Sequence, residues 1–165
     1  MALKTLEDAL LEELEDLLSA ETQISKALPK MAKKATNPKL VKAFETHLKE
    51  TEGQIERLNQ AFGLLGKKAK SKTCEATKGL VKEGEGVMEE EADPDVMDAM
   101  LIGAAQKIEH YEIATYGTVC TWAETLGLDE LHDLLGETLD EEEETNDLLS
   151  DLAEAGINQD AIKED

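Results

Sequence analysis

Apolar residues recur along most of this chain at alternating steps of four and three, the spacing that places side chains on one face of an α-helix. The pattern is clearest near the start, where the apolar positions are Leu10, Leu14, Leu17, Ile24 and Leu28. It predicts long helices over residues 5–35, 38–63, 94–126 and 129–155, and a shorter, glycine-interrupted helix over residues 74–91. The predicted fold class is all-α, and the 165 residues (1–165) are expected to form a single domain.

The predicted helix boundaries coincide with capping signals. Thr5 followed by Asp8 resembles a capping box, and the pairs Asn37-Pro38 and Asp93-Pro94 each combine a capping side chain with a proline at the first helical position. Pro29 lies inside the first helix, where its missing N–H is expected to kink the helix. These boundaries divide the chain into two helical hairpins, each closed by a short turn.

The connection between the two hairpins is about thirty residues long. A connection of this length can carry the chain from one end of a bundle to the other, which a plain up-down bundle does not need. We therefore expect a ferritin-like four-helix bundle, with an extra short helix in the crossover.

Polar side chains interrupt the apolar face of each long helix. Glu21 occupies a position where the spacing calls for an apolar residue, and burying an uncompensated carboxylate costs several kcal/mol. The candidate metal ligands found in this way are Glu21, His47, Glu50, Glu109, Glu112, Glu141 and Glu144. Carboxylates that converge from four helices together with one histidine form a suitable ligand set for a pair of metal ions.

The spacing of these residues supports a dinuclear site. Two residues at i and i+3 lie on one helix face with Cβ atoms about 5–6 Å apart, so both side chains can reach one ion or bridge two. Carboxylates with one imidazole favour iron, with manganese as the second choice. The absence of cysteine from these faces argues against structural zinc or an iron–sulfur cluster.

Several of these carboxylates also have a purely structural interpretation. Glu21 and Glu112 could reach solvent at the edge of the helix face, or accept a hydrogen bond from a tyrosine or a core threonine. The acidic run 140–144 covers every side of its helix, so most of it must face solvent. Within this run Glu142 is the alternative ligand to Glu144.

The remaining candidates leave similar alternatives. His47 could be an ordinary core histidine, although it shares its face with Glu50. Gln54, one turn beyond Glu50, could orient a ligand or a water molecule. Tyr111 and Tyr116 could donate hydrogen bonds or act as redox outlets, but ordinary core packing is the simpler interpretation for both.

Composition narrows the classes of partner. The net charge of −21, from 38 acidic and 17 basic residues, argues against nucleic acid and anionic membranes, because binding to phosphates needs basic patches. No apolar run approaches the roughly 20 residues that a membrane span requires. The N-terminus has no signal-like segment and the only cysteines are Cys74 and Cys120, so we expect reduced thiols and a cytoplasmic location.

Three separated segments resemble one known family. They are residues 109–116 (EHYEIATY), 47–58 (HLKETEGQIERL) and 74–80 (CEATKGL). The segments are similar to those of the YciF-type ferritin-like stress proteins of bacteria, and the resemblance extends over most of the chain. It implies a ferritin-like bundle with a crossover helix, a homodimer and a dinuclear metal site. The leading function is then that of a di-iron protein with oxidase or peroxidase activity, and the alternative is a non-enzymatic stress or scaffold protein with a structural or vestigial metal site.

The ligand order differs from that of the wider relatives. Rubrerythrins and ferritins have a Glu-x-x-His step on two helices. Here the order is reversed at His47-x-x-Glu50, and Glu141-x-x-Glu144 contains no histidine. The resemblance therefore predicts the type of site rather than the order of its ligands.

Overall fold

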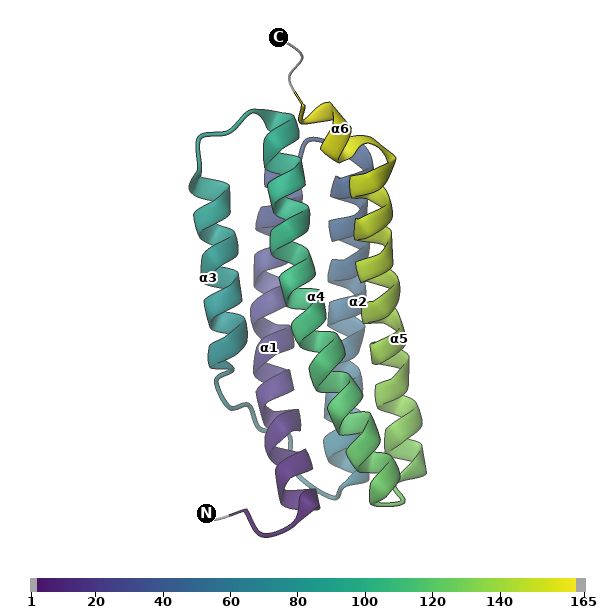
Figure 1. Cartoon of the computed structure of the whole chain (residues 1–165). Coiled ribbons are helices and arrows are strands. Elements are labelled where there is room, and N and C mark those ends of the chain that lie inside the picture. Colours follow the sequence, from purple (N-terminus) through teal and green to yellow (C-terminus); the bar gives the residue numbers. More distant parts are fainter. Residues whose placement is uncertain (1–2, 163–165) are drawn as a thin grey trace.

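The chain forms a bundle of long α-helices, and the computed structural model describes residues 3–162 (Figure 1). The helices are α1 (Leu6–Lys34), α2 (Pro38–Leu64), α3 (Glu75–Glu89), α4 (Pro94–Thr125), α5 (Asp129–Leu152) and the short α6 (Asn158–Asp160), which follows a π-helical turn at Ala153–Ile157. No strand occurs in the part of the chain that the structure describes. The all-α prediction is confirmed.

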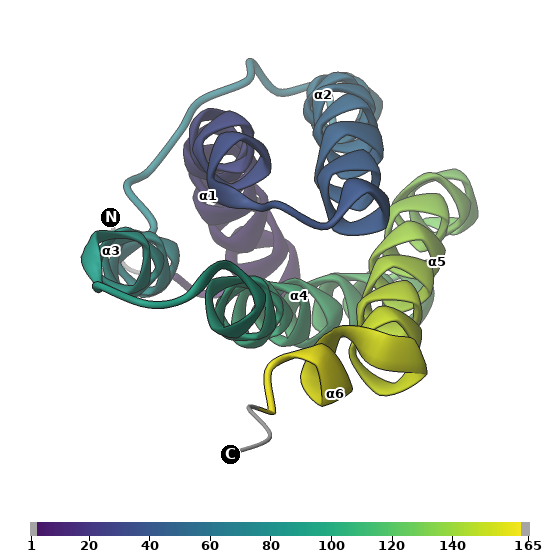
Figure 2. The same ribbon diagram turned by 90° about the horizontal axis from the view of Figure 1, so that it is seen from above.

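Helices α1, α2, α4 and α5 pack together, and α3 lies outside them against α1 and α4 (Figure 2). α1 and α5 run in one direction, whereas α2 and α4 run in the other (Figure 1). Because α2 and α4 are parallel, the chain must return to the opposite end of the bundle between them, and the linker together with α3 makes this return. The arrangement is the predicted ferritin-like four-helix bundle with a helix in the crossover.

Local sequence signals define the helix ends. The Asp8 N–H donates to the Thr5 hydroxyl and the Thr5 N–H donates to the Asp8 carboxylate, both at 3.1 Å, which completes the predicted capping box. The Asn37 side chain caps the start of α2. Gly66 and Gly127, with φ angles of 63° and 68°, adopt the left-handed conformation just past the ends of α2 and α4.

A buried carboxylate fastens the turn between α1 and α2 to the start of α4. Asp98 on α4 is 1% exposed, and it accepts hydrogen bonds from the Thr36 N–H at 2.8 Å, the Thr36 hydroxyl at 2.7 Å and the Asn37 N–H at 2.7 Å. Hydrogen bonds to an ionised acceptor are stronger than neutral ones. Pro29 does not end α1, which continues to Lys34. The turn between α1 and α2 therefore begins after Lys34.

A polar layer divides the core into two hydrophobic clusters. The upper cluster in the view of Figure 1 includes Ile24, Leu28, Phe44, Leu101 and Leu149, and the lower one includes Leu14, Leu58, Phe62, Val119 and Leu135. The polar residues lie between them along all four helices of the bundle. This layer is therefore shielded by apolar side chains on both sides.

The structure corrects the predicted inward face of α5. Helical spacing predicts an inward face that contains Leu131, Leu134, Thr138, Glu141, Thr145, Leu148 and Leu152. The structure buries Leu131, Thr138 and Thr145 as predicted, but it buries Leu135, Glu142 and Leu149 in place of Leu134, Glu141 and Leu148. Both series fit the same helical spacing, and neighbouring residues differ by about 100° around the helix axis. Leu148 is consequently 44% exposed.

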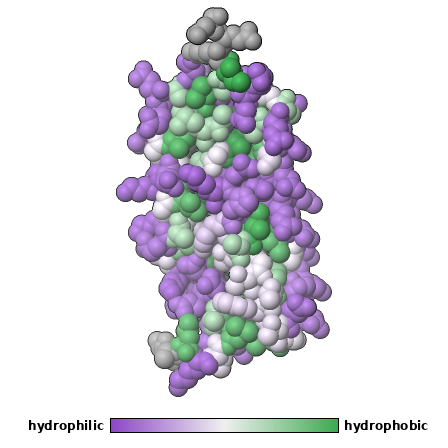
Figure 3. All heavy atoms as spheres, in the orientation of Figure 1, coloured by the Kyte–Doolittle hydropathy of each residue, from purple (hydrophilic) through white to green (hydrophobic). Residues whose placement is uncertain are grey.

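Hydrophilic residues cover much of the face shown in Figure 3, with apolar patches between them. The outer side of α4 contributes exposed residues without charge, namely Gly103, Ala114, Thr118 and Thr121. Within residues 3–162, the helices lack a segment both long enough and apolar enough to cross a membrane.

Candidate metal centre

Four buried side chains converge in the polar layer from three helices. They are His47 on α2, Glu109 and Glu112 on α4, and Glu142 on α5, and one ligand atom of each lies within 4.8 Å of those of the others. Glu21, on α1, lies close enough to His47, Glu109 and Glu112 for these groups to shift its pKa. All five residues are at most 2% exposed.

The helical spacing explains how these side chains meet. Glu109 and Glu112 are three residues apart, so they project from the same side of α4. Glu21 and His47 each replace an apolar residue in the stripe of their helix. Since the four stripes meet along the bundle axis, the replacements meet there as well.

Three contacts hold individual atoms of the cluster. The Tyr116 hydroxyl donates to Glu21 Oε1 at 2.5 Å, and the Gln54 amide donates to Glu142 Oε1 at 2.5 Å. His47 Nε2 lies 3.2 Å from Glu109 Oε1, which is an ion-pair distance but lacks the geometry of a hydrogen bond.

Several buried atoms of the five side chains have no hydrogen-bond partner among residues 3–162. They are Glu21 Oε2, Glu109 Oε2, Glu142 Oε2, both oxygens of Glu112 and both ring nitrogens of His47. Buried polar atoms are normally paired, so each exception calls for water, an ion or another partner. These seven atoms are nitrogen and carboxylate oxygen, which are the donors that iron and manganese accept. The residues present therefore fit a metal site.

The protonation states of the cluster are strongly perturbed. Burial raises the pKa of the Glu21 carboxyl to about 7, and it also raises the pKa values of Glu112 and Glu142 well above the usual range. Burial acts to lower the pKa of His47, but the Glu109 carboxylate raises it well above its usual value. Burial opposes ionisation of Glu109, but the charge of His47 lowers the pKa of that carboxyl. The metal-free cluster thus combines one ion pair with protonated carboxyls.

The structure brings together four of the seven predicted ligands, namely Glu21, His47, Glu109 and Glu112. Glu50 lies at the edge of the cluster, with its side chain 35% exposed and Oε2 at 3.6 Å from His47 Nδ1.

Glu141 and Glu144 are not part of the cluster, and the prediction of their position was wrong. Glu141 bonds to Arg57 instead, and Glu144 is exposed on the surface of α5. Glu142, the alternative considered for Glu144, projects into the layer. The reason is that the inward position between Thr138 and Thr145 is one residue later than predicted, as described above.

Sequence reasoning also missed Arg57. It lies three residues after Gln54 on the same helix face, which is the one signal in the sequence for its proximity to the site. Gln54, predicted to orient a ligand, does bond to the carboxylate of Glu142.

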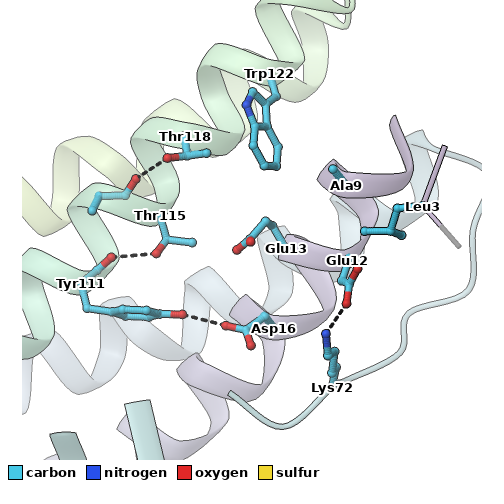
Figure 4. Close-up of a pocket in the computed structure, with 11 residues that line it drawn as sticks. Leu3, Ala9, Glu12, Glu13, Asp16, Lys72, Tyr111, Thr115, Thr118 and Trp122 are labelled. Carbon is cyan, nitrogen blue, oxygen red and sulfur yellow. Dashed lines mark hydrogen bonds and ion pairs between the residues drawn. The ribbon is translucent and has the colours of Figure 1, made fainter. Parts of the chain in front are cut away.

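Tyr111 bonds outside the cluster, next to a surface groove of about 450 Å³ between α1 and α4 (Figure 4). Its hydroxyl donates to Asp16 at 2.7 Å and lies 3.0 Å from the Cys74 sulfur. No residue of the buried cluster lines this groove. Of the two tyrosines considered as donors to a buried carboxylate, only Tyr116 has that role in residues 3–162.

Comparisons of the sequence and the structure with known proteins agree on one family. Residues 5–162 match the family described as Domain of unknown function (DUF892). Protein YciF of Escherichia coli strain K12 is 47% identical over 162 residues, which are 98% of either chain.

Solved structures extend this similarity. The crystal structure of the E. coli stress protein YciF matches with a TM-score of 0.91 at 47% identity, over 95% of this chain and 99% of that chain. YcfI from Rhodopseudomonas palustris matches with a TM-score of 0.87 at 48% identity, over 89% and 94% of the two chains. A protein from Xanthomonas campestris pv. campestris, 21% identical, shares the fold with a TM-score of 0.76 over 94% and 95%. The chain therefore belongs to the DUF892 family and, as its three motif segments predicted, to the YciF-type ferritin-like proteins.

Proposed function

We propose that the polar layer binds two divalent metal ions, with iron as the first choice and manganese as the second. The observation that supports this proposal is the group of seven buried donor atoms on five converging side chains that have no hydrogen-bond partner in the described part of the chain. Charge also favours two ions. The four positive charges of two divalent cations balance the four negative charges of the ionised carboxylates of Glu21, Glu109, Glu112 and Glu142. An uncompensated set of buried carboxylates would be unfavourable.

The partners of each oxygen suggest how the residues would share the ions. Neither oxygen of Glu112 has a hydrogen-bond partner among residues 3–162, so this carboxylate would offer both oxygens to the ions. Glu21 and Glu142 each have one oxygen free, because the other already accepts a hydrogen bond. His47 would supply the nitrogen ligand. Its imidazole ring would then bind the metal in place of its contact with Glu109.

The proposed activity is oxidation of ferrous iron by dioxygen or peroxide, in the cytoplasm. Iron bound in the layer would supply the electrons for this chemistry. The chain's own contribution is to fix the ligands and to keep bulk water away with the two hydrophobic clusters. Tyr116, which donates to Glu21, holds a proton at the edge of the layer.

The alternative is a stress or scaffold protein in which the ion is only structural. The E. coli relative is a stress protein by name, and the single histidine in this cluster is compatible with a structural ion. The two functions differ in one measurable respect, because a structural ion would stabilise the fold without reacting with peroxide.

Metal analysis and a ferrous titration test the proposal. Protein purified without chelators should contain iron or manganese, and metal-free protein should bind two Fe(II) ions per chain under anaerobic conditions. Peroxide added afterwards should oxidise the bound iron, seen as increased near-ultraviolet absorbance. Absence of bound metal in both experiments would refute the metal site, and binding without oxidation would favour the structural alternative.

Two variants provide a matched comparison on the acidic residues. Glu112→Gln removes a charge from the centre of the cluster, so it should lower the number of ions bound. Glu144→Gln removes the same charge from an exposed position on α5, so it should leave binding unchanged. Equal loss in both variants would mean that total charge, rather than this cluster, binds the metal.

A further inference from the structure

A buried amide connects the cluster to an ion pair near the surface. Gln54, on α2, is fully buried, and its side-chain nitrogen donates to two carboxylates of α5. The distances are 2.5 Å to Glu142 Oε1 and 2.9 Å to Glu141 Oε2. Both hydrogens of the amide are therefore used.

Glu141 is itself held by Arg57. The guanidinium donates to Glu141 Oε1 at 2.6 Å and to Glu141 Oε2 at 2.7 Å, the two-pronged geometry that orients a carboxylate. It also donates to the Thr138 hydroxyl at 3.2 Å. On its outer side the Arg57 Nε lies 3.2 Å from Glu137, whose side chain is 65% exposed.

These contacts fix the orientation of the Gln54 amide. If the amide were rotated by half a turn, its carbonyl oxygen would lie about 2.9 Å from Glu141 Oε2, which the bond to Arg57 keeps ionised, and the two oxygens would repel each other. Glu141, anchored by Arg57, therefore keeps the nitrogen directed toward Glu142. Since that nitrogen occupies Glu142 Oε1, only Oε2 of this carboxylate remains free.

We infer that the Arg57–Glu141 ion pair is a positioning device for the metal centre, which acts through Gln54 to present a single oxygen of Glu142 to one ion. This inference rests on the proposed function. Arg57 and Glu141 would not touch the metal, so they are positioning residues. Contacts of this kind around a metal ligand commonly change affinity 10- to 100-fold when they are removed.

A purely structural role makes a different prediction. The side chains of Arg57 and Glu141 are 20% and 25% exposed, and they join α2 to α5, two neighbouring helices of the bundle (Figure 2). As a fastener between helices the pair would affect folding alone. As a positioning device it would affect one of the two ions and leave the other unchanged.

The experiment uses the whole chain and Co(II) alone as the probe, because visible absorbance of Co(II) reports its coordination. Wild type should bind two ions per chain. Arg57→Gln and Glu141→Gln should raise the Kd of one ion 10- to 100-fold and change its absorbance bands, whereas the second ion keeps its Kd. Arg57→Lys, which keeps the charge but loses the two-pronged contact, should fall between wild type and Arg57→Gln.

Glu137→Gln is the matched control. It removes the outer partner of the same guanidinium, but it does not touch the chain of contacts through Glu141 and Gln54. Both Co(II) affinities should then equal those of wild type. If Glu137→Gln changed the Co(II) affinities as much as Glu141→Gln does, the inference would be overturned. Loss of any partner of Arg57 would then be enough to weaken metal binding.

A second measurement is independent of metal. In the metal-free protein, the side-chain amide protons of Gln54 should resonate downfield in a nitrogen–proton correlation spectrum, because both are donated to carboxylates. In Glu141→Gln, at least one resonance should move upfield, while Glu137→Gln leaves both in place. Unchanged resonances in Glu141→Gln would overturn the inference even if Arg57→Gln failed to fold.

The outcomes separate the inference from the proposed function. If wild type binds no Co(II), Fe(II) or Mn(II), the proposed function fails and the inference falls with it. If wild type binds two ions and Glu141→Gln binds both with unchanged affinity and absorbance, the inference alone fails.

Discussion

Replacement of Glu21 by glutamine should increase the stability of the metal-free protein, by an amount that depends on pH. The Glu21 carboxyl has a pKa of about 7 in the folded protein, because it is fully buried, against an ordinary value of 4.5. The folded state therefore binds the proton of this group more tightly than the unfolded state does. The contribution of this tighter proton binding to the free energy of unfolding is fully present below pH 4.5 and is lost as the pH rises through 7.

The size of the effect follows from the two pKa values. At about 1.4 kcal/mol per pKa unit, the difference between 4.5 and about 7 corresponds to about 3 kcal/mol. Glu21→Gln removes this penalty, because the amide is neutral at every pH and its oxygen can still accept the hydrogen bond of Tyr116. Loss of the charge also relieves Glu112, whose pKa is raised first by burial and then by neighbouring carboxylates that include Glu21.

Urea unfolding of the metal-free protein in the presence of a chelator would measure this effect. From pH 5 to pH 8, wild type should lose about 2.5 kcal/mol of unfolding free energy relative to Glu21→Gln, because part of the effect is already lost at pH 5. Glu144→Gln, an exposed carboxylate on α5, should follow the pH dependence of wild type. If the curves of wild type and Glu21→Gln stay parallel over this range, Glu21 does not titrate as a buried acid and the reasoning is refuted.

Other predictions concern the cluster and its surroundings. Binding of two divalent ions at pH 6 should release about four protons, three from carboxyls and one from the imidazole, and release of fewer than two in a pH-stat would contradict this. Glu142→Gln should weaken binding of at least one ion by calorimetry, whereas Glu144→Gln should not. Asp98→Asn should lower the free energy of unfolding, measured in urea, by about 2–4 kcal/mol, because it replaces the carboxylate that accepts three hydrogen bonds. Ala114→Arg, next to the exposed Thr118 on the outer side of α4, should convert the expected homodimer to a monomer in light scattering, and an unchanged mass would show that this part of α4 is not its interface.

The sequence predicted the cluster residues on α1, α2 and α4, because apolar residues on either side of them in each helix show which face is buried. Glu21 lies between Leu17 and Ile24, so one spacing fits and the carboxylate must face inward. His47 follows Phe44 at the same spacing and lies on the face that ends in Leu58, so it also points inward. An isolated exception to a clear pattern is informative, since no neighbouring residue can take its place.

The inward-facing residues of α5 could not be identified from the sequence in this way. Residues 140–144 are all acidic, so a shift of one residue replaces one carboxylate by another. The leucine pairs at 134–135 and 148–149 fit either series as well. Packing against α2 and α4 decides between them, and it buries Glu142 and directs Glu141 toward Arg57.

The arrangement of the layer is easier to explain by a bound cation than by stability alone. Burial raises the pKa of three of its carboxyls, so folding without metal near neutral pH must either retain their protons or bury their charges. Leucine at Glu21, Glu112 and Glu142 would join the two hydrophobic clusters and avoid this cost. Proteins keep such unfavourable groups mainly at functional sites, where binding offsets the cost. Both a catalytic and a structural ion would do so, and for that reason metal binding should be tested before any activity.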